Sequence, residues 1–188
     1  MDKLSKIKNS QPQKLRRELQ QSSDSDLNLR RAVIGLSLLG IGAMTAVTLF
    51  QTGVVKHLPD PPIDGFDSDK VNSSDTAYAL GVPDGSLSLA SLAANIPLAA
   101  FGGENRAEEM PLVPLAAAAK ATVEAAVAGW YFYQMPTKEK AWCGYCIVGA
   151  LANWGIAGLT LIEAKRAWKA LRKNQIAGIK SVNFLKNQ

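Results

Sequence analysis

Four long apolar stretches alternate with polar segments along this 188-residue chain. A helix of about 20 residues crosses the roughly 30 Å hydrocarbon layer of a bilayer, so a window of about 19 residues detects such spans. The apolar stretches cover residues 32–55, 80–101, 111–133 and 143–161. This pattern predicts an all-α integral membrane protein built as a four-helix bundle.

The second and third stretches carry features of their own. Pro83, Asp84 and Gly85 interrupt the start of the second stretch, so we expect a short span whose clean core begins at Ser86. The third stretch ends in the aromatic sequence WYFY, residues 130–133, which is typical of a membrane–water boundary.

Positive charge gathers at the two ends of the chain. Residues 1–31 and 163–188 hold fifteen of the 21 Lys and Arg residues. Four spans put both ends on one side, and the positive-inside rule makes that side the cytoplasm. We therefore expect a basic, partly disordered or lipid-bound N-terminal segment (1–31), a membrane bundle (32–165) and a basic tail that extends the last helix (166–188). A secretion signal is the alternative for the first span, but its apolar run exceeds the usual length.

Both cysteines of the chain, Cys143 and Cys146, form a C-x-x-C pair where the fourth span begins. The predicted topology places them at the outer face, where disulfide chemistry is possible. A helix N-terminus also favours the thiolate that disulfide exchange requires. A structural zinc site lacks ligands, since His57 is the one histidine, and a c-type haem would need histidine where Ile147 stands. Two structural or palmitoylated cysteines remain the alternative.

Polar side chains within the spans are candidates for a ligand site. Ser88, Ser91 and Asn95 share one face of the second span and suit either quinone binding or hydrogen bonds between helices. Lys120 and Glu124 stand four residues apart in the third span, and mutual neutralisation is favoured over a proton relay. A dithiol at this boundary can meet a soluble thiol protein from outside and a quinone from within the bilayer.

Several segments together resemble the vitamin K epoxide reductase family of membrane thiol–quinone oxidoreductases. They are AWCGYC at the start of the last span, LASLAANIPLAAFGG in the second, and the preceding GFDSDKVNSSDTAYALGVPDGS. The resemblance covers about residues 32–165. It implies a protein of the bacterial plasma membrane that passes electrons from a dithiol to ubiquinone, menaquinone or a similar quinone, through a redox-active disulfide.

The resemblance also implies roles for individual residues. Cys146 would pass electrons to the quinone, Cys143 would exchange disulfides with the donor, and Ser91 and Asn95 would bind the quinone. Typical family members carry a second cysteine pair in the first outer loop, but residues 56–79 contain none. We therefore expect a separate thioredoxin-like donor and membrane lipid as partners, and no nucleic acid. A non-catalytic membrane subunit or scaffold that binds a partner or an isoprenoid ligand is the alternative.

Overall fold

A computed structural model describes residues 11–186 of the chain, with side chains over residues 12–174. The expectations for residues 1–10 and 187–188 lie outside the described residues. Within the described part, helices make up all the regular structure apart from one isolated bridge between Phe66 and Trp142. The elements are α2 (Gln11–Gln21), α3 (Ser25–Gln51), α4 (Ser68–Asn72), α5 (Asp84–Ala100), α6 (Arg106–Glu109), α7 (Leu112–Gln134), the π-helix η1 (Met135–Glu139) and α8 (Gly144–Lys186). The all-α prediction is confirmed over this range.

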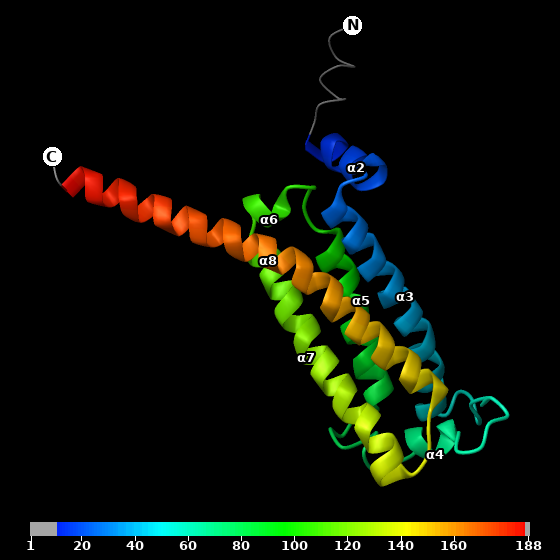
Figure 1. Ribbon diagram of the computed structural model, residues 1–188. Helices are drawn as coiled ribbons and strands as arrows, with labels where there is room; N and C mark the ends of the chain where they lie inside the picture. Colours follow the sequence, from blue (N-terminus) through cyan, green and yellow to red (C-terminus); the bar gives the residue numbers. More distant parts are fainter. Residues whose placement is uncertain (1–10, 187–188) are drawn as a thin grey trace, which may run out of the picture.

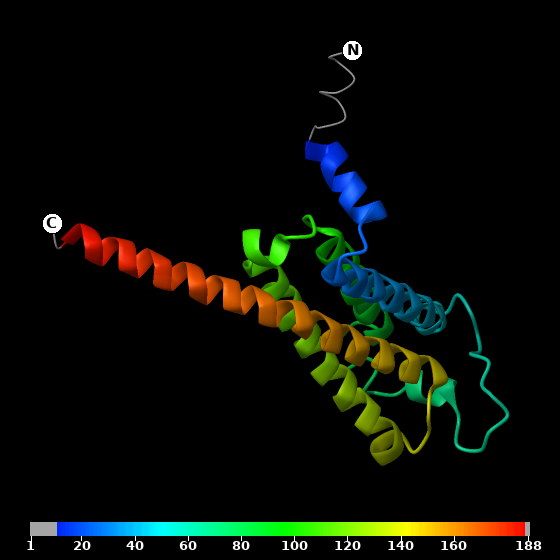
Figure 2. The same cartoon turned by 45° about the horizontal axis from the view of Figure 1, so that its top comes forward.

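The long helices α3, α5, α7 and α8 lie side by side as a bundle (Figure 1). Helix α3 packs along both α5 and α8, and α7 packs along α8, whereas α5 and α7 touch each other much less. The short helix α4 lies at one end of the bundle and α6 at the other, as the turned view in Figure 2 also shows. The flank between α5 and α7 is thus the most loosely closed side.

Three of these helices are long and apolar enough to cross a membrane, over Ser25–Gln51, Leu112–Glu139 and Gly144–Asn174. They fit a multi-pass membrane protein. Helix α5 has 17 residues and a length of about 26 Å, slightly less than the hydrocarbon layer. Its start at Asp84 agrees with the late start expected for the second span. The count of four spans therefore stays a prediction.

Helix α3 begins and ends earlier than the first apolar stretch predicts. Helix α3 begins at Ser25 rather than residue 32, because the Asp24 carboxylate accepts hydrogen bonds from the N–H groups of Asp26 and Leu27. The helix ends at Gln51 rather than residue 55, where Gly53 takes a positive φ of 77°. Residues 11–21, expected to be partly disordered or lipid-bound, form the helix α2.

The core of the bundle lies where α3, α5 and α8 meet. Val47, Leu92 and Ile156 are each at most 1% exposed. A Cβ atom on Gly85 would come within 2.7 Å of the Val47 side chain, so α5 begins in direct contact with α3. Helix α8 continues past the bundle to Lys186, in line with the expected extension of the last helix into the tail (Figure 1).

Candidate functional site

The C-x-x-C pair forms the N-terminal cap of α8. Cys143 directly precedes the helix, and its Sγ accepts a hydrogen bond from the backbone N–H of Cys146 at 3.1 Å. The backbone N–H of Ile147 bonds the Cys143 carbonyl at 3.0 Å, which closes the first turn. A helix cap accepts from the N–H group three residues on, so the spacing of the two cysteines is the spacing of a cap. Both are free thiols.

Asn72 of α4 bridges the two thiols. Its Nδ2 donates to Cys143 Sγ at 3.2 Å, and its Oδ1 accepts from Cys146 Sγ at 3.5 Å. The same Nδ2 donates to the Ser68 carbonyl at 2.7 Å, which fixes the direction of the amide. One buried carboxamide therefore supplies a donor to the first cysteine and an acceptor to the second.

These contacts change the acidity of Cys143, which lies just outside the membrane-spanning part of α8. Hydrogen bonds from Cys146, Ser68 and Asn72 and the Cys146 backbone N–H together lower the pKa of Cys143 to about 7, against the opposing effect of burial. The bond from Cys146 has the largest effect. About half of the Cys143 population is thus thiolate at neutral pH, which is the nucleophilic form.

The loop between α3 and α5 fixes α4 over Cys143. The Asp60 carboxylate accepts from the Ser68 N–H at 2.7 Å and from the Ser68 hydroxyl at 2.6 Å. The N–H of Asp67 donates to the Trp142 carbonyl at 2.9 Å, next to the cysteine. As a result Cys143 is 0% exposed. A protein donor can touch this sulfur only after α4 has moved.

Cys146 faces a cavity of about 330 Å³ on the other side of the pair. Its polar wall residues include Asn72, Ser91 and Glu124. Leu87, Val123 and Val127 also line the cavity and are between 43% and 64% exposed, so the cavity wall reaches the outer surface of the bundle. These three come from α5 and α7, so the cavity opens on the loosely closed flank of the bundle.

The predicted polar residues meet in one cluster. Lys120 and Glu124 form the expected ion pair. Ser91 Oγ donates to Glu124 Oε1, and Asn95 Nδ2 donates to Glu124 Oε2 at 3.1 Å. Lys120 Nζ also donates to the Ser91 carbonyl at 2.8 Å and to Asn95 Oδ1 at 2.9 Å. The structure thus brings Ser91 into the cavity with Cys146, while Asn95 lies behind it and holds the charged pair; Ser88 also lines the cavity.

Sequence reasoning missed Asn72, Ser68 and Asp60. All three lie in the polar segment between the first two apolar stretches, where a hydrogen-bonding residue does not stand out. The four-residue spacing of Ser68 and Asn72, which places them on one face of a short helix, is a signal that could have found them. Glu124 was noted for its charge, but its place in the cavity wall depends on how α5 and α7 approach each other.

The family model described as the vitamin K epoxide reductase family matches residues 31–161. The chain belongs to the vitamin K epoxide reductase family. Members of this family are membrane oxidoreductases that use quinones and work with thiol partners. The match includes both cysteines and all four long helices of the bundle, in whole or in part. No curated protein and no solved structure matches the chain.

Proposed function

We propose that the protein is a membrane thiol–quinone oxidoreductase that passes electrons from a dithiol, through Cys143 and Cys146, to a membrane quinone. The observation that carries the proposal is the position of Cys146, which shares the 330 Å³ cavity with lipid-facing side chains of α5 and α7. A quinone dissolved in the bilayer reaches this thiol without crossing water. The donor thiolate attacks Cys143 in the Cys143–Cys146 disulfide, and the pKa of about 7 makes Cys143 a good leaving group when the donor's second thiol resolves the mixed disulfide.

The cavity fits the ring of a quinone. Its volume suits a small apolar ligand, and its wall combines apolar side chains with a few polar groups. The Ser91 hydroxyl donates to a quinone carbonyl oxygen when it turns away from Glu124, while Asn95 holds the Glu124 carboxylate in place. A bound quinone supplies a two-electron acceptor beside Cys146.

The same proposal covers the topology and the partners. Helix α5 is the second of four spans, both chain ends lie in the cytoplasm, and the cysteines lie at the outer face of a bacterial plasma membrane. The segments 1–31, 32–165 and 166–188 are the N-terminal arm, the membrane bundle and the tail. The donor is a separate thioredoxin-like protein, because residues 56–79 hold no cysteine to relay its electrons. Such a donor must displace α4 before it reaches Cys143.

A non-catalytic scaffold is the second candidate. The complete burial of Cys143 under α4 favours it, because a buried thiol does not exchange disulfides. In that case the same cavity holds an isoprenoid ligand without turnover.

Purified protein with dithiothreitol and a short-chain ubiquinone separates the two candidates. We expect dithiol-dependent quinol formation, followed by absorbance, that falls at least a hundredfold in Cys143→Ser and in Cys146→Ser. Ser73→Ala, an exposed change on the same outer loop, is the matched control and keeps the wild-type rate. Against a thioredoxin-like protein whose single cysteine carries thionitrobenzoate, the Cys143 thiolate of Cys146→Ser displaces the thionitrobenzoate and stays in a mixed disulfide, since no resolving thiol remains. Wild-type protein that forms no quinol with several quinones would establish the scaffold instead.

A further inference from the structure

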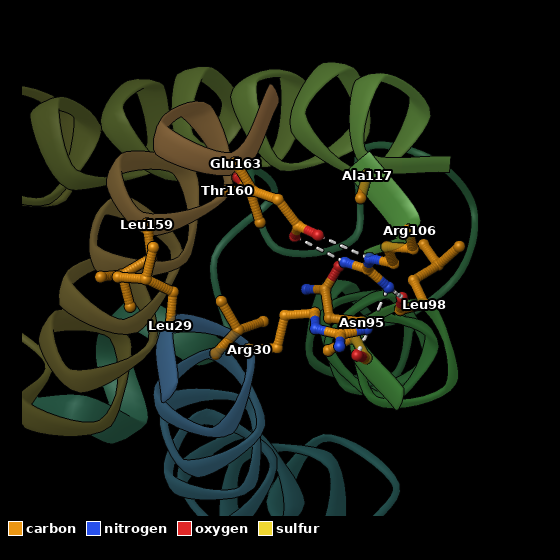
Figure 3. Close-up of a pocket in the computed structure, with 11 residues that line it drawn as sticks. Leu29, Arg30, Asn95, Leu98, Arg106, Ala117, Leu159, Thr160 and Glu163 are labelled. Carbon is orange, nitrogen blue, oxygen red and sulfur yellow. Dashed lines mark hydrogen bonds and ion pairs between the residues drawn. The ribbon is translucent and has the colours of Figure 1, made fainter. Parts of the chain in front are cut away.

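A second, smaller cavity lies toward the end of the bundle opposite to the cysteines. Figure 3 shows Arg30, Asn95, Arg106 and Glu163 gathered around it. Its volume is about 10 Å³, roughly the space that one water molecule occupies. Ala117 of α7 also lines this cavity.

The charged groups around this cavity are buried. Arg30, Arg106 and Glu163 are each 3% exposed or less. Arg106 bonds both carboxylate oxygens of Glu163 at 2.7 Å, but Arg30 Nε has no hydrogen-bond partner among the residues described. The cavity has room for one water molecule, which would accept a hydrogen bond from Arg30 Nε.

Asn95 connects the small cavity to the quinone cavity. Its side chain lines the small cavity and also bonds Lys120 Nζ at 2.9 Å and Glu124 Oε2 at 3.1 Å. Glu124 and its partner Ser91 in turn line the quinone cavity. Two clusters of polar and ionisable groups, which a water molecule in the small cavity would join beside Asn95, thus form an interrupted series through an otherwise apolar bundle. Ionisable residues inside membrane helices commonly serve as proton relays.

The series reaches water at the end of the bundle that carries α6. Glu163 lies close enough to Asp26 for the two carboxylates to interact electrostatically. Asp26 pairs with Arg166 at 2.5 Å, and the Arg166 side chain is 45% exposed. The charged groups that face this series are Asp26, Arg30, Arg106, Glu163 and Arg166 at the α6 end and Lys120 and Glu124 in the middle.

We propose that the quinone takes up its protons from the α6 end of the bundle, through Glu163, the small cavity beside Asn95 and the Lys120–Glu124 pair. The inference rests on the proposed quinone reduction. The dithiol loses two electrons and two protons as its sulfur–sulfur bond forms, and these protons leave at the cysteine end. The quinone gains two electrons and two protons to become quinol. Proton release and uptake then occur on opposite sides of the membrane, and the reaction moves charge across it.

Full-length protein in liposomes with a trapped pH dye tests the proposal. Dimercaptosuccinate, a charged dithiol that does not cross membranes, reduces only the molecules whose cysteine end faces the medium. With a short-chain ubiquinone in the bilayer, we expect the lumenal pH to rise because two protons leave the lumen for each quinol formed. A protonophore abolishes this change without stopping quinol formation.

Variants trace the route of the protons. Glu124→Gln removes the ionisable group on the quinone cavity, and Ala117→Val fills the small cavity without touching a charge. Each is expected to lower the lumenal protons taken up per quinol at least tenfold. Thr122→Val, on the lipid-exposed face of α7, is the control that keeps the wild-type ratio.

The outcomes separate this proposal from the proposed function. Quinol formation with a constant lumenal pH would overturn the proton route and leave the enzyme intact. A wild-type ratio in both Glu124→Gln and Ala117→Val would overturn the route through these residues. A wild type that forms no quinol would overturn the quinone reduction, and the proton route with it.

Discussion

The side chain of Asn72 determines which of the two thiols is more readily deprotonated. It donates to Cys143 and accepts from Cys146, so it stabilises a thiolate on the first and a thiol on the second. An aspartate at this position could offer only acceptors when ionised and would repel the Cys143 thiolate. An apolar residue would remove both bonds. Which of the two cysteines carries the thiolate thus depends on a residue of α4 that lies outside the C-x-x-C sequence.

This arrangement predicts the pH dependence of the thiolate. The pKa of Cys143 is lowered to about 7, so its thiolate absorbance near 240 nm rises as the pH passes through about 7. Asn72→Leu removes a donor to the thiolate, and the midpoint should rise by about one pH unit. The absorbance step is expected to disappear in Cys143→Ser, while Ser73→Ala serves as the control. An unchanged midpoint in Asn72→Leu would show that the amide does not stabilise the thiolate.

Helix α4 and the loop around it show what a single sequence can and cannot predict. The apolar runs predicted both ends of α7 and the start of α8 to within one residue, because burial in lipid requires long uncharged stretches, but they placed the start of α3 seven residues too late. The C-x-x-C pair and the Lys120–Glu124 pair were likewise recognisable from local spacing. Contacts between distant segments could not be recognised in this way. Asn72 and Cys143 are 71 residues apart in the sequence, and Ser91 and Glu124 are 33 residues apart. Such contacts depend on helix packing, which local spacing does not encode.

At the same scale, the contact of α5 with α7 depends on one polar cluster. Lys120→Met leaves the Glu124 carboxylate in the bundle without its cation, which should cost about 3 kcal/mol in the free energy of unfolding. The double variant Lys120→Met, Glu124→Gln removes both charges and is expected to lose less than the single variant. Thermal unfolding in detergent measures both. Additive losses would mean that the two side chains do not stabilise each other.

The whole molecule has two chemically different ends. The cysteine end carries α4 and the acidic outer loop, whereas the other end carries α2, α6 and the basic extension of α8 (Figure 1). The quinone cavity lies between them and the small cavity lies nearer the basic end. In the proposed reaction the thiol donor therefore approaches at the cysteine end, the quinone enters between α5 and α7, and the protons enter at the basic end.

The proposed topology is tested by cysteine labelling in intact cells. In a chain whose two native cysteines are replaced by serine, Ile63→Cys on the outer loop, at a position that is 61% exposed, should react with a membrane-impermeant maleimide. Ser23→Cys and Lys173→Cys, both at exposed positions of the opposite end, should react only after permeabilisation. Reaction of the Lys173→Cys variant in intact cells would mean that the chain crosses the membrane differently.

The exposed side chains of Leu87, Val123 and Val127 make the wall of the quinone cavity part of the outer surface of the bundle. An acceptor that enters by this side arrives by two-dimensional diffusion. The concentration that governs saturation is therefore its mole fraction among the lipids and not its amount per volume of buffer. Diluting a suspension of vesicles leaves that fraction unchanged, whereas adding plain lipid lowers it. A cell could accordingly adjust the rate of this protein through the composition of its membrane alone.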